Sequence, residues 1–208
     1  MSKCIWVVAV LHLCTFSVAQ AGQLTVQLAN AAGQPVTNAA AYATLLSASA
    51  PARPKRDIAI EQFNKEFVPL VSIIQVGTMV NFPNRDTIRH HVYSFSPAKT
   101  FEIKLYSGVL VKPVAFEKPG EVVLGCNIHD SMIAYVLVVD TPFFAKSDSQ
   151  GQALLDNLPA GEYEVSMWYP GATDVPVSQK VKVGATENAV ARFTYNFKPL
   201  IAGPGAGK

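Results

Sequence analysis

The feature that most limits how this chain can fold is a two-residue alternation of apolar and polar side chains. It occurs in short runs that are separated by turn sequences such as Pro83-Asn84, Ser107-Gly108 and Lys118-Pro119-Gly120. The period of two is that of a strand with one buried face, and no long stretch has the helical period of 3.6. The sequence therefore predicts an all-β chain, and so many short strands predict a sandwich or a barrel. The predicted strand segments are residues 23–27, 39–46, 58–60, 67–74, 79–82, 91–95, 101–105, 121–124, 133–139, 153–158, 161–168, 181–183 and 190–195.

The first 21 residues are predicted to be a signal peptide. A short positive start, Met1-Ser2-Lys3, precedes an almost wholly apolar run at residues 4–18, and Ala19-Gln20-Ala21 has the small-x-small pattern of a cleavage site. The apolar run is short for a membrane span, and no later segment is long enough for one. We expect an exported protein that is cut before Gly22 and has no membrane span when mature. A retained N-terminal anchor is the alternative interpretation.

The cysteine and histidine residues that remain after removal of this leader are few and close together. Cys126 is the one cysteine left, so it has no partner for an internal disulfide. A free thiol is a liability in an oxidising compartment unless something occupies it. The remaining histidines are His90, His91 and His129, so all soft metal ligands other than methionine lie in two short segments.

The charge balance argues against one class of partner. Lys3 is the one charged residue of the leader, which leaves 16 basic residues beside 15 acidic ones. Binding to nucleic acid depends on an excess of positive charge that faces the phosphates. A nearly neutral chain gives no reason to expect a nucleic-acid partner.

A candidate metal site lies in the loop between the predicted strands at 121–124 and 133–139. Cys126, His129 and Met132 occur there at Cys-x2-His-x2-Met spacing, and a tight loop can turn all three side chains toward one point. A blue copper site takes two imidazoles and a thiolate in one plane, with a weak axial thioether. The second imidazole has to come from a neighbouring strand, and His90 lies at the start of one.

Other interpretations of these residues are open. His91 can be the ligand in place of His90, or both histidines can be ordinary residues at a strand edge. Cys126 can be a small buried hydrophobe, and Met132 can be a core methionine, since methionine packs well in any core. The same cysteine and histidines can also form a closed zinc site.

The residues around this candidate site carry a resemblance to a known family. Residues 76–86 (VGTMVNFPNRD), which lead to His90-His91-Val92, resemble the front half of the plastocyanin/azurin family of cupredoxins, and residues 126–132 resemble its short, amicyanin-like ligand loop. Residues 57–140 together resemble a plastocyanin/amicyanin-like cupredoxin of the periplasmic methylamine utilisation type. The resemblance implies a Greek-key cupredoxin β-sandwich. It also implies copper (Cu+/Cu2+) bound by His90, Cys126, His129 and Met132.

Two departures from the family pattern concern residues that hold the ligands in place. Proline usually lies next to the ligands in such short loops, and this loop has Asn127-Ile128 and Asp130-Ser131 instead. The first-ligand motif is usually His-Asn-Val, whose asparagine ties the two ligand segments together by a hydrogen bond. Since this chain has His91 at that position, we predict that His91 and Asn127 exchange those roles.

The remaining parts of the chain resemble a second, small β-sandwich of the prealbumin-like or carboxypeptidase-regulatory-like kind. The C-terminal motifs are residues 148–151 (DSQG) and 158–163 (LPAGEY), and residues 24–28 with Gly33-Gln34-Pro35 supply the strand and turn with which such a unit begins. We predict that the copper domain is inserted into this sandwich, with simple succession along the chain as the alternative. The predicted boundaries are 1–21 for the signal peptide, 22–50 and 141–196 for the small sandwich, 51–140 for the copper domain and 197–208 for the tail.

The combined prediction is a periplasmic, non-enzymatic electron carrier. A site held between packed strands moves little when its charge changes and leaves no open position for substrate. The expected partner is a redox protein, such as a c-type cytochrome or a dehydrogenase, that meets the exposed edge of His129 as in the family. One alternative is a copper-handling protein that delivers or stores Cu+ without redox turnover. Another is an adhesion or scaffold protein that uses the C-terminal sandwich.

Overall fold

The computed structural model describes residues 21–47, 56–109, 112–172, 178–186 and 188–197. Within these ranges the chain consists of strands and their connections without a helix, which confirms the predicted all-β class. In the same ranges, therefore, no helix is long and apolar enough to cross a membrane. The predicted leader lies outside the described residues except for Ala21, and so does the predicted tail except for Phe197.

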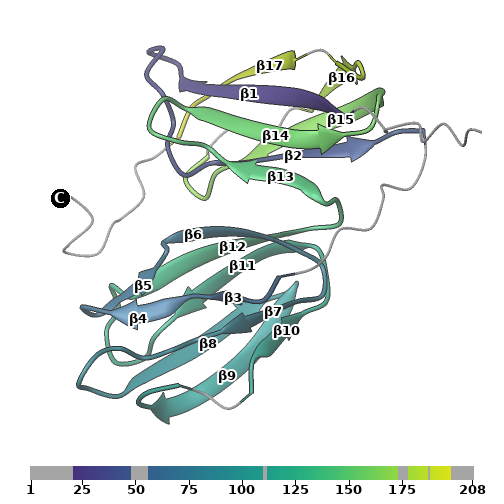
Figure 1. Cartoon of the computed structure of the whole chain (residues 1–208). Helices are drawn as coiled ribbons and strands as arrows, with labels where there is room; N and C mark the ends of the chain where they lie inside the picture. Colours follow the sequence, from purple (N-terminus) through teal and green to yellow (C-terminus); the bar gives the residue numbers. More distant parts are fainter. Residues whose placement is uncertain (1–20, 48–55, 110–111, 173–177, 187, 198–208) are drawn as a thin grey trace, which may run out of the picture.

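The strands form two stacked bodies, and the strands near the two chain ends share one of them (Figure 1). That body consists of a sheet of order β14-β1-β17 packed on a sheet of order β13-β2-β15-β16. β1 lies in the middle of the first sheet because it pairs antiparallel with β14 and parallel with β17. The strand bounds are β1 (Gly22–Asn30), β2 (Ala40–Leu45), β13 (Phe143–Lys146), β14 (Gln152–Leu158), β15 (Gly161–Trp168), β16 (Gln179–Val183) and β17 (Asn188–Tyr195).

The alternating sequence of β1 explains this packing. Leu24, Val26 and Leu28 are buried, and they enter one core with residues of the facing sheet. Tyr163 and Phe143 lie in that core with their rings edge to face, 5.7 Å apart between centroids. Burial of apolar side chains from both sheets is the main favourable term that holds such a sandwich together.

The second body is built from the middle of the chain and is drawn in teal in the lower half of Figure 1. A five-stranded sheet of order β6-β12-β11-β8-β9 faces a sheet of order β10-β7-β3, and β4 and β5 form a separate hairpin. Both sheets contribute to one apolar core, which includes Phe82, Phe116, Leu124 and Val136. The bounds are β3 (Ile58–Ala59), β4 (Glu61–Phe63), β5 (Glu66–Val68), β6 (Val71–Gln75), β7 (Thr78–Asn81), β8 (His90–Ser96), β9 (Lys99–Tyr106), β10 (Val114–Phe116), β11 (Gly120–Gly125) and β12 (Ile133–Val139).

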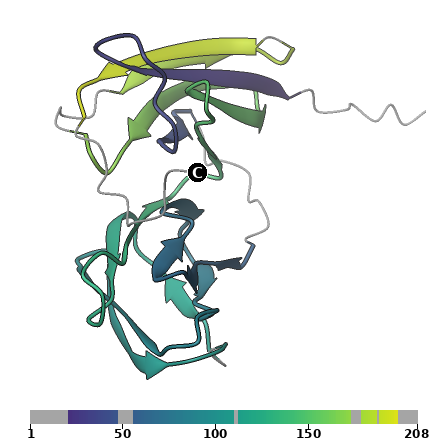
Figure 2. The ribbon, with the colours of Figure 1, turned by 90° about the vertical axis from the view of Figure 1, so that its left-hand side faces the viewer.

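The two bodies meet through a third, small apolar cluster, at the waist that Figure 2 shows from the side. The outer face of β6 and β12 packs there against β2 and the end of β15. The indole Nε1 of Trp168 donates a hydrogen bond to Glu121 Oε1 at 2.5 Å across this contact, and Lys146 Nζ donates one to Val71 O at 3.3 Å. The buried members of the cluster are Ala40, Val71, Leu137, Val139 and Trp168.

The strands differ in two ways from those predicted from sequence. β4, β10 and β13 were not predicted, because each has only three or four residues and too few alternations to be recognised. The apolar run at 67–74 was expected to be one strand, but it is divided between β5, in the hairpin, and β6, in the large sheet. Proline has no N–H for a sheet ladder, so Pro69 is a physical reason for this break.

Candidate metal centre

Three strands deliver the candidate ligands to one end of the large sheet. β8 begins at His90, β11 ends at Gly125 immediately before Cys126, and β12 begins at Ile133 immediately after the loop. Gly125 is paired with Tyr93 of β8, which brings the start of the loop beside the start of β8. Two residues distant in sequence, His90 and Cys126, are neighbours for this reason.

The loop between β11 and β12 is closed by short-range hydrogen bonds. Met132 N donates to His129 O at 2.9 Å, and Ile133 N donates to Ser131 O at 3.1 Å. Ile128 N donates to the sulfur of Cys126 at 3.5 Å. This contact fixes the position of the sulfur within the loop.

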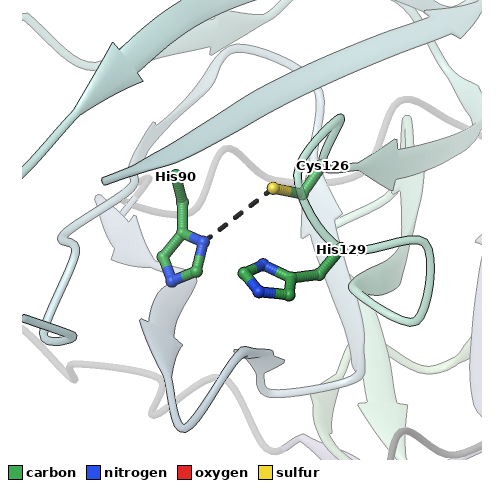
Figure 3. Close-up of side chains that lie close together, drawn as sticks. All are labelled: His90, Cys126 and His129. Carbon is green, nitrogen blue, oxygen red and sulfur yellow. Dashed lines mark hydrogen bonds between the residues drawn. The ribbon is translucent and has the colours of Figure 1, made fainter. Parts of the chain in front are cut away.

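His90, Cys126 and His129 form a compact group (Figure 3). One potential ligand atom from each residue lies within 4.8 Å of those of the other two. Nδ1 of His90 lies 3.9 Å from Cys126 Sγ, and the rings of His90 and His129 are 5.3 Å apart between centroids, at 62° to each other. Among the described residues this is the only group of three or more His, Cys, Asp or Glu side chains that could hold a metal ion.

The three side chains differ in their access to solvent. His90 is completely buried, Cys126 is 3% exposed and His129 is half-buried. The buried Nδ1 of His129 has no hydrogen-bond partner. Since an unpaired buried polar atom costs about 1–3 kcal/mol, this atom fits a metal ligand better than a structural residue.

The other ring nitrogen of His90 is held by a carboxylate. His90 Nε2 and Asp86 Oδ2 are 2.7 Å apart, and the Asp86 carboxylate also accepts hydrogen bonds from the backbone amides of Asn64 and Lys65. Burial acts to raise the pKa of Asp86, but the hydrogen bonds from Lys65, His90 and Asn64 outweigh it, so the pKa lies below its ordinary value. Asp86 is therefore ionised at neutral pH.

Met132 is completely buried and belongs to the apolar core of the second body. It also borders, with Cys126, a surface pocket that is lined further by Tyr93, Phe95 and Val123. This position is compatible with an axial ligand and with a core methionine. The axial role of Met132 stays a prediction.

His91 and Asn127 lie apart from each other. His91 is buried next to Tyr93, with its Nε2 3.0 Å from Glu102 Oε1 and its Nδ1 unpaired. Asn127 is exposed. No hydrogen bond joins these two side chains or ties them to the ligands within the described part of the chain, so the exchange of roles predicted for them stays a prediction without support.

Sequence reasoning missed the residues that hold the His90 segment. Asn84 donates to the carbonyl oxygens of Ile88 and Tyr106, at 2.9 Å each, and accepts from Asp86 N through its Oδ1. The sequence predicts only a turn at Pro83-Asn84. The signal available in the sequence was the Asp86-x3-His90 spacing, which becomes meaningful only once the backbone is known to turn between the two residues.

No family model matches this chain, and no curated protein matches it either. Solved structures of copper proteins are similar to it. The copper-containing nitrite reductase of Thermus scotoductus SA-01 is 25% identical over 47% of this chain and 26% of its own, with a TM-score of 0.39. The purple cupredoxin of Nitrosopumilus maritimus is 23% identical over 40% of this chain and 100% of its own, with a TM-score of 0.35.

A reduced Cu(I) form of an amicyanin mutant is 19% identical over 47% of this chain and 99% of its own, with a TM-score of 0.37. The chain thus spans about a quarter of the nitrite reductase and nearly the whole of the two small proteins. The similarity to cupredoxins that the sequence motifs indicated is found again among solved structures, in each case over less than half of this chain.

Proposed function

We propose that this chain is a periplasmic one-electron carrier that binds one copper ion through His90, Cys126, His129 and, axially, Met132. The observation that carries the proposal is the convergence of a buried thiol and two imidazoles, with ligand atoms within 4.8 Å of one another. Thiolate and imidazole together suit both Cu+ and Cu2+. If Cys126 were only a buried side chain that binds no metal, the unpaired Nδ1 of His129 would remain unexplained.

Bound copper would supply the exchange of a single electron, and the chain's own residues would set the conditions for it. His90 and Cys126 are shielded from water, and both are fixed by hydrogen bonds that exist without the metal. A pre-formed site has little to rearrange when its charge changes. His129 is half-buried, so its ring edge offers the route to a redox partner, beside the exposed side chain of Ile128.

The same proposal covers the rest of the chain. Residues 51–140 would be the copper domain, inserted between segments 22–50 and 141–196 of a small sandwich whose sheets mix strands from both segments. Residues 1–21 would direct export to the periplasm. Export supplies the oxidising compartment in which a lone cysteine benefits from a bound metal.

The test is visible absorption and electron paramagnetic resonance of the mature protein after loading with Cu2+. We expect an intense thiolate-to-copper band with narrow hyperfine splitting, and its complete loss in Cys126→Ala. Asp130→Asn is the matched control, because it changes an exposed residue of the same loop without removing a ligand.

Other results of this experiment would contradict the proposal. A colourless protein that binds only Cu+ would favour a copper-handling role. Preference for Zn2+ over both copper ions would indicate a closed structural site. Absence of metal binding would leave the second sandwich as the functional part and favour an adhesion or scaffold protein.

A further inference from the structure

We propose that Asp86, clamped by the β4–β5 hairpin, presets His90 in the tautomer whose Nδ1 is free to bind a metal. We further propose that the same carboxylate lowers the reduction potential of the bound copper. The first part concerns the metal-free chain. The second part rests on the proposed function.

The contact between the two side chains assigns the tautomer. His90 Nε2 lies 2.7 Å from Asp86 Oδ2, in a place where the imidazole is completely buried and the carboxylate side chain is 12% exposed. Both carboxylate oxygens of Asp86 already accept hydrogen bonds from backbone amides, so the carboxylate acts as the acceptor and the hydrogen of this contact lies on Nε2. A neutral imidazole with hydrogen on Nε2 has a lone pair on Nδ1, and this Nδ1 faces Cys126 Sγ at 3.9 Å.

The carboxylate is itself fixed by backbone groups of another element. Asn64 N donates to Asp86 Oδ1 at 2.7 Å and Lys65 N donates to Oδ2 at 2.9 Å. These two residues form the turn between β4 and β5, with φ angles of 53° and 60°. Two successive residues with positive φ direct both amides at one anion, so the hairpin acts as a clamp on Asp86.

The clamp is attached to the segment that carries Asp86. Gln62 of β4 accepts a hydrogen bond from Arg85 N at 2.8 Å, and the side chain of Arg85 bonds to Glu61 at 3.0 Å. Asp86 N donates to Asn84 Oδ1 at 2.9 Å. Both the backbone and the carboxylate of Asp86 are therefore immobilised before any metal arrives.

Nδ1 of His129 is buried without a hydrogen-bond partner, like a nitrogen that is left free for a metal. In the described part of the chain, no carboxylate contact holds the other ring nitrogen of His129 as Asp86 holds that of His90. A hydrogen bond to a carboxylate increases the basicity of a ligand imidazole. The extra negative charge favours Cu2+ over Cu+, which corresponds to a lower reduction potential.

The first experiment needs no metal. Long-range 1H–15N correlation spectra of the histidine rings in the metal-free wild type, at neutral pH, report the protonation of each nitrogen. We expect His90 to have hydrogen on Nε2 and none on Nδ1. Hydrogen on Nδ1 of His90, alone or together with Nε2, would overturn the inference whether or not the protein binds copper.

The second experiment compares Asp86→Asn with Asp130→Asn. Each variant removes one negative charge near the candidate centre, but Asp130 is exposed and makes no hydrogen bond to His90. We expect Asp86→Asn to weaken Cu2+ binding by about 10- to 100-fold and to weaken Cu+ binding less. A tenfold change in the ratio of the two affinities corresponds to a rise of about 59 mV in potential.

The results of this comparison distinguish a failure of the hydrogen-bond mechanism from a failure of the proposed function. A rise in potential in Asp86→Asn that clearly exceeds that in Asp130→Asn supports the hydrogen-bond mechanism. Equal shifts in the two variants would contradict it, because charge alone would then explain them. A wild type that binds no copper would contradict the proposed function and the second part of the inference, while the ring spectra still decide the first part.

Discussion

At the scale of single residues, Gly125, which precedes Cys126, lies closely against the Tyr93 ring of the neighbouring strand. A Cβ on Gly125 would lie 2.7 Å from the Cζ and Oη atoms of Tyr93, so the absence of a side chain is what allows the tyrosine ring to cover this position. Tyr93 is itself held between His91 and Phe95, with ring centroids 5.5 and 5.1 Å away. The residue before Cys126 is thus constrained by packing from the neighbouring strand.

We expect Gly125→Ala to destabilise the protein by about 1–2 kcal/mol, because the Tyr93 ring must move out of its tilted contacts with His91 and Phe95. Unfolding by denaturant measures the change. The same substitution in a Tyr93→Ala background should cost less, with a coupling energy of about 1 kcal/mol between the two sites. Additive effects of the two substitutions would show that the ring and the glycine do not interact.

A second prediction at this scale concerns the hydroxyl group of Tyr106. It donates to Phe82 O at 2.6 Å and accepts from the side-chain amide of the buried Gln62. Tyr106→Phe leaves both of these groups without a partner, so we expect a loss of about 1–3 kcal/mol in the free energy of unfolding at neutral pH. A loss well below 1 kcal/mol would indicate that water replaces the hydroxyl.

The same residue predicts a pH dependence. Burial is the main cause that raises the pKa of Tyr106 to about 12 in the folded protein. The hydrogen bond from Gln62 acts to lower this pKa, and the charge of Cys126 acts to raise it. Its value in the unfolded chain is about 10. The contribution of Tyr106 to stability is therefore complete below pH 10 and is lost as the pH rises toward 12. The stability difference between wild type and Tyr106→Phe should shrink over this window, and a constant difference would contradict the assignment.

At the scale of elements, the turn before β14 shows why a glycine is required at one position and dispensable at another. Gly151 has a φ of +69°, and a Cβ there would lie 2.3 Å from Leu28 O of β1. Gly33 has a similar φ of +77°, but a Cβ there would have no neighbour within 4 Å. The backbone strain of a substitution is thus similar at both sites, and only the contact with β1 differs.

We therefore expect Gly33→Ala to cost about 1 kcal/mol, from the unfavourable backbone conformation alone. Gly151→Ala should cost several times more, because the displaced Leu28 carbonyl belongs to the strand that joins β14 to β17. Denaturant unfolding of the two variants makes the comparison. Similar losses in both would mean that the turn relaxes away from β1.

At the scale of the whole molecule, the contact between the two bodies is small but specific. Trp168 is 7% exposed, packs on the outer face of β6 and β12, and is hydrogen-bonded to Glu121 of β11. β11 is also the strand that ends beside Cys126. The contact thus joins the sandwich that contains β1 and β17 directly to β11, the strand that leads to Cys126.

We expect Trp168→Ala to uncouple the two bodies, because loss of a buried tryptophan side chain costs about 3–5 kcal/mol. Calorimetry should then resolve two unfolding transitions in place of one. Glu121→Gln is the matched control, since its side-chain oxygen can still accept the indole hydrogen bond. An unchanged single transition in Trp168→Ala would show that the bodies unfold together for other reasons.

Local sequence determined the strands and the loop that carries most of the candidate site. Alternation along residues 24–28 (LTVQL) is enough to specify a half-buried strand, because the side chains of a strand point alternately to its two faces. Cys126, His129 and Met132 are within seven residues of one another, so their proximity follows from chain length. The all-β class was predictable for the same local reasons.

Tertiary structure decided the rest, because it depends on which strands pair. His90 and His91 are adjacent in sequence and point to opposite faces of β8. The pairing of β11 with β8 places His90 beside Cys126, and the pairing of β8 with β9 places His91 beside Glu102. The clamp on Asp86 comes from a hairpin more than twenty residues earlier in the chain. Contacts between such distant segments depend on the packing of whole sheets, which the alternation of one segment does not encode.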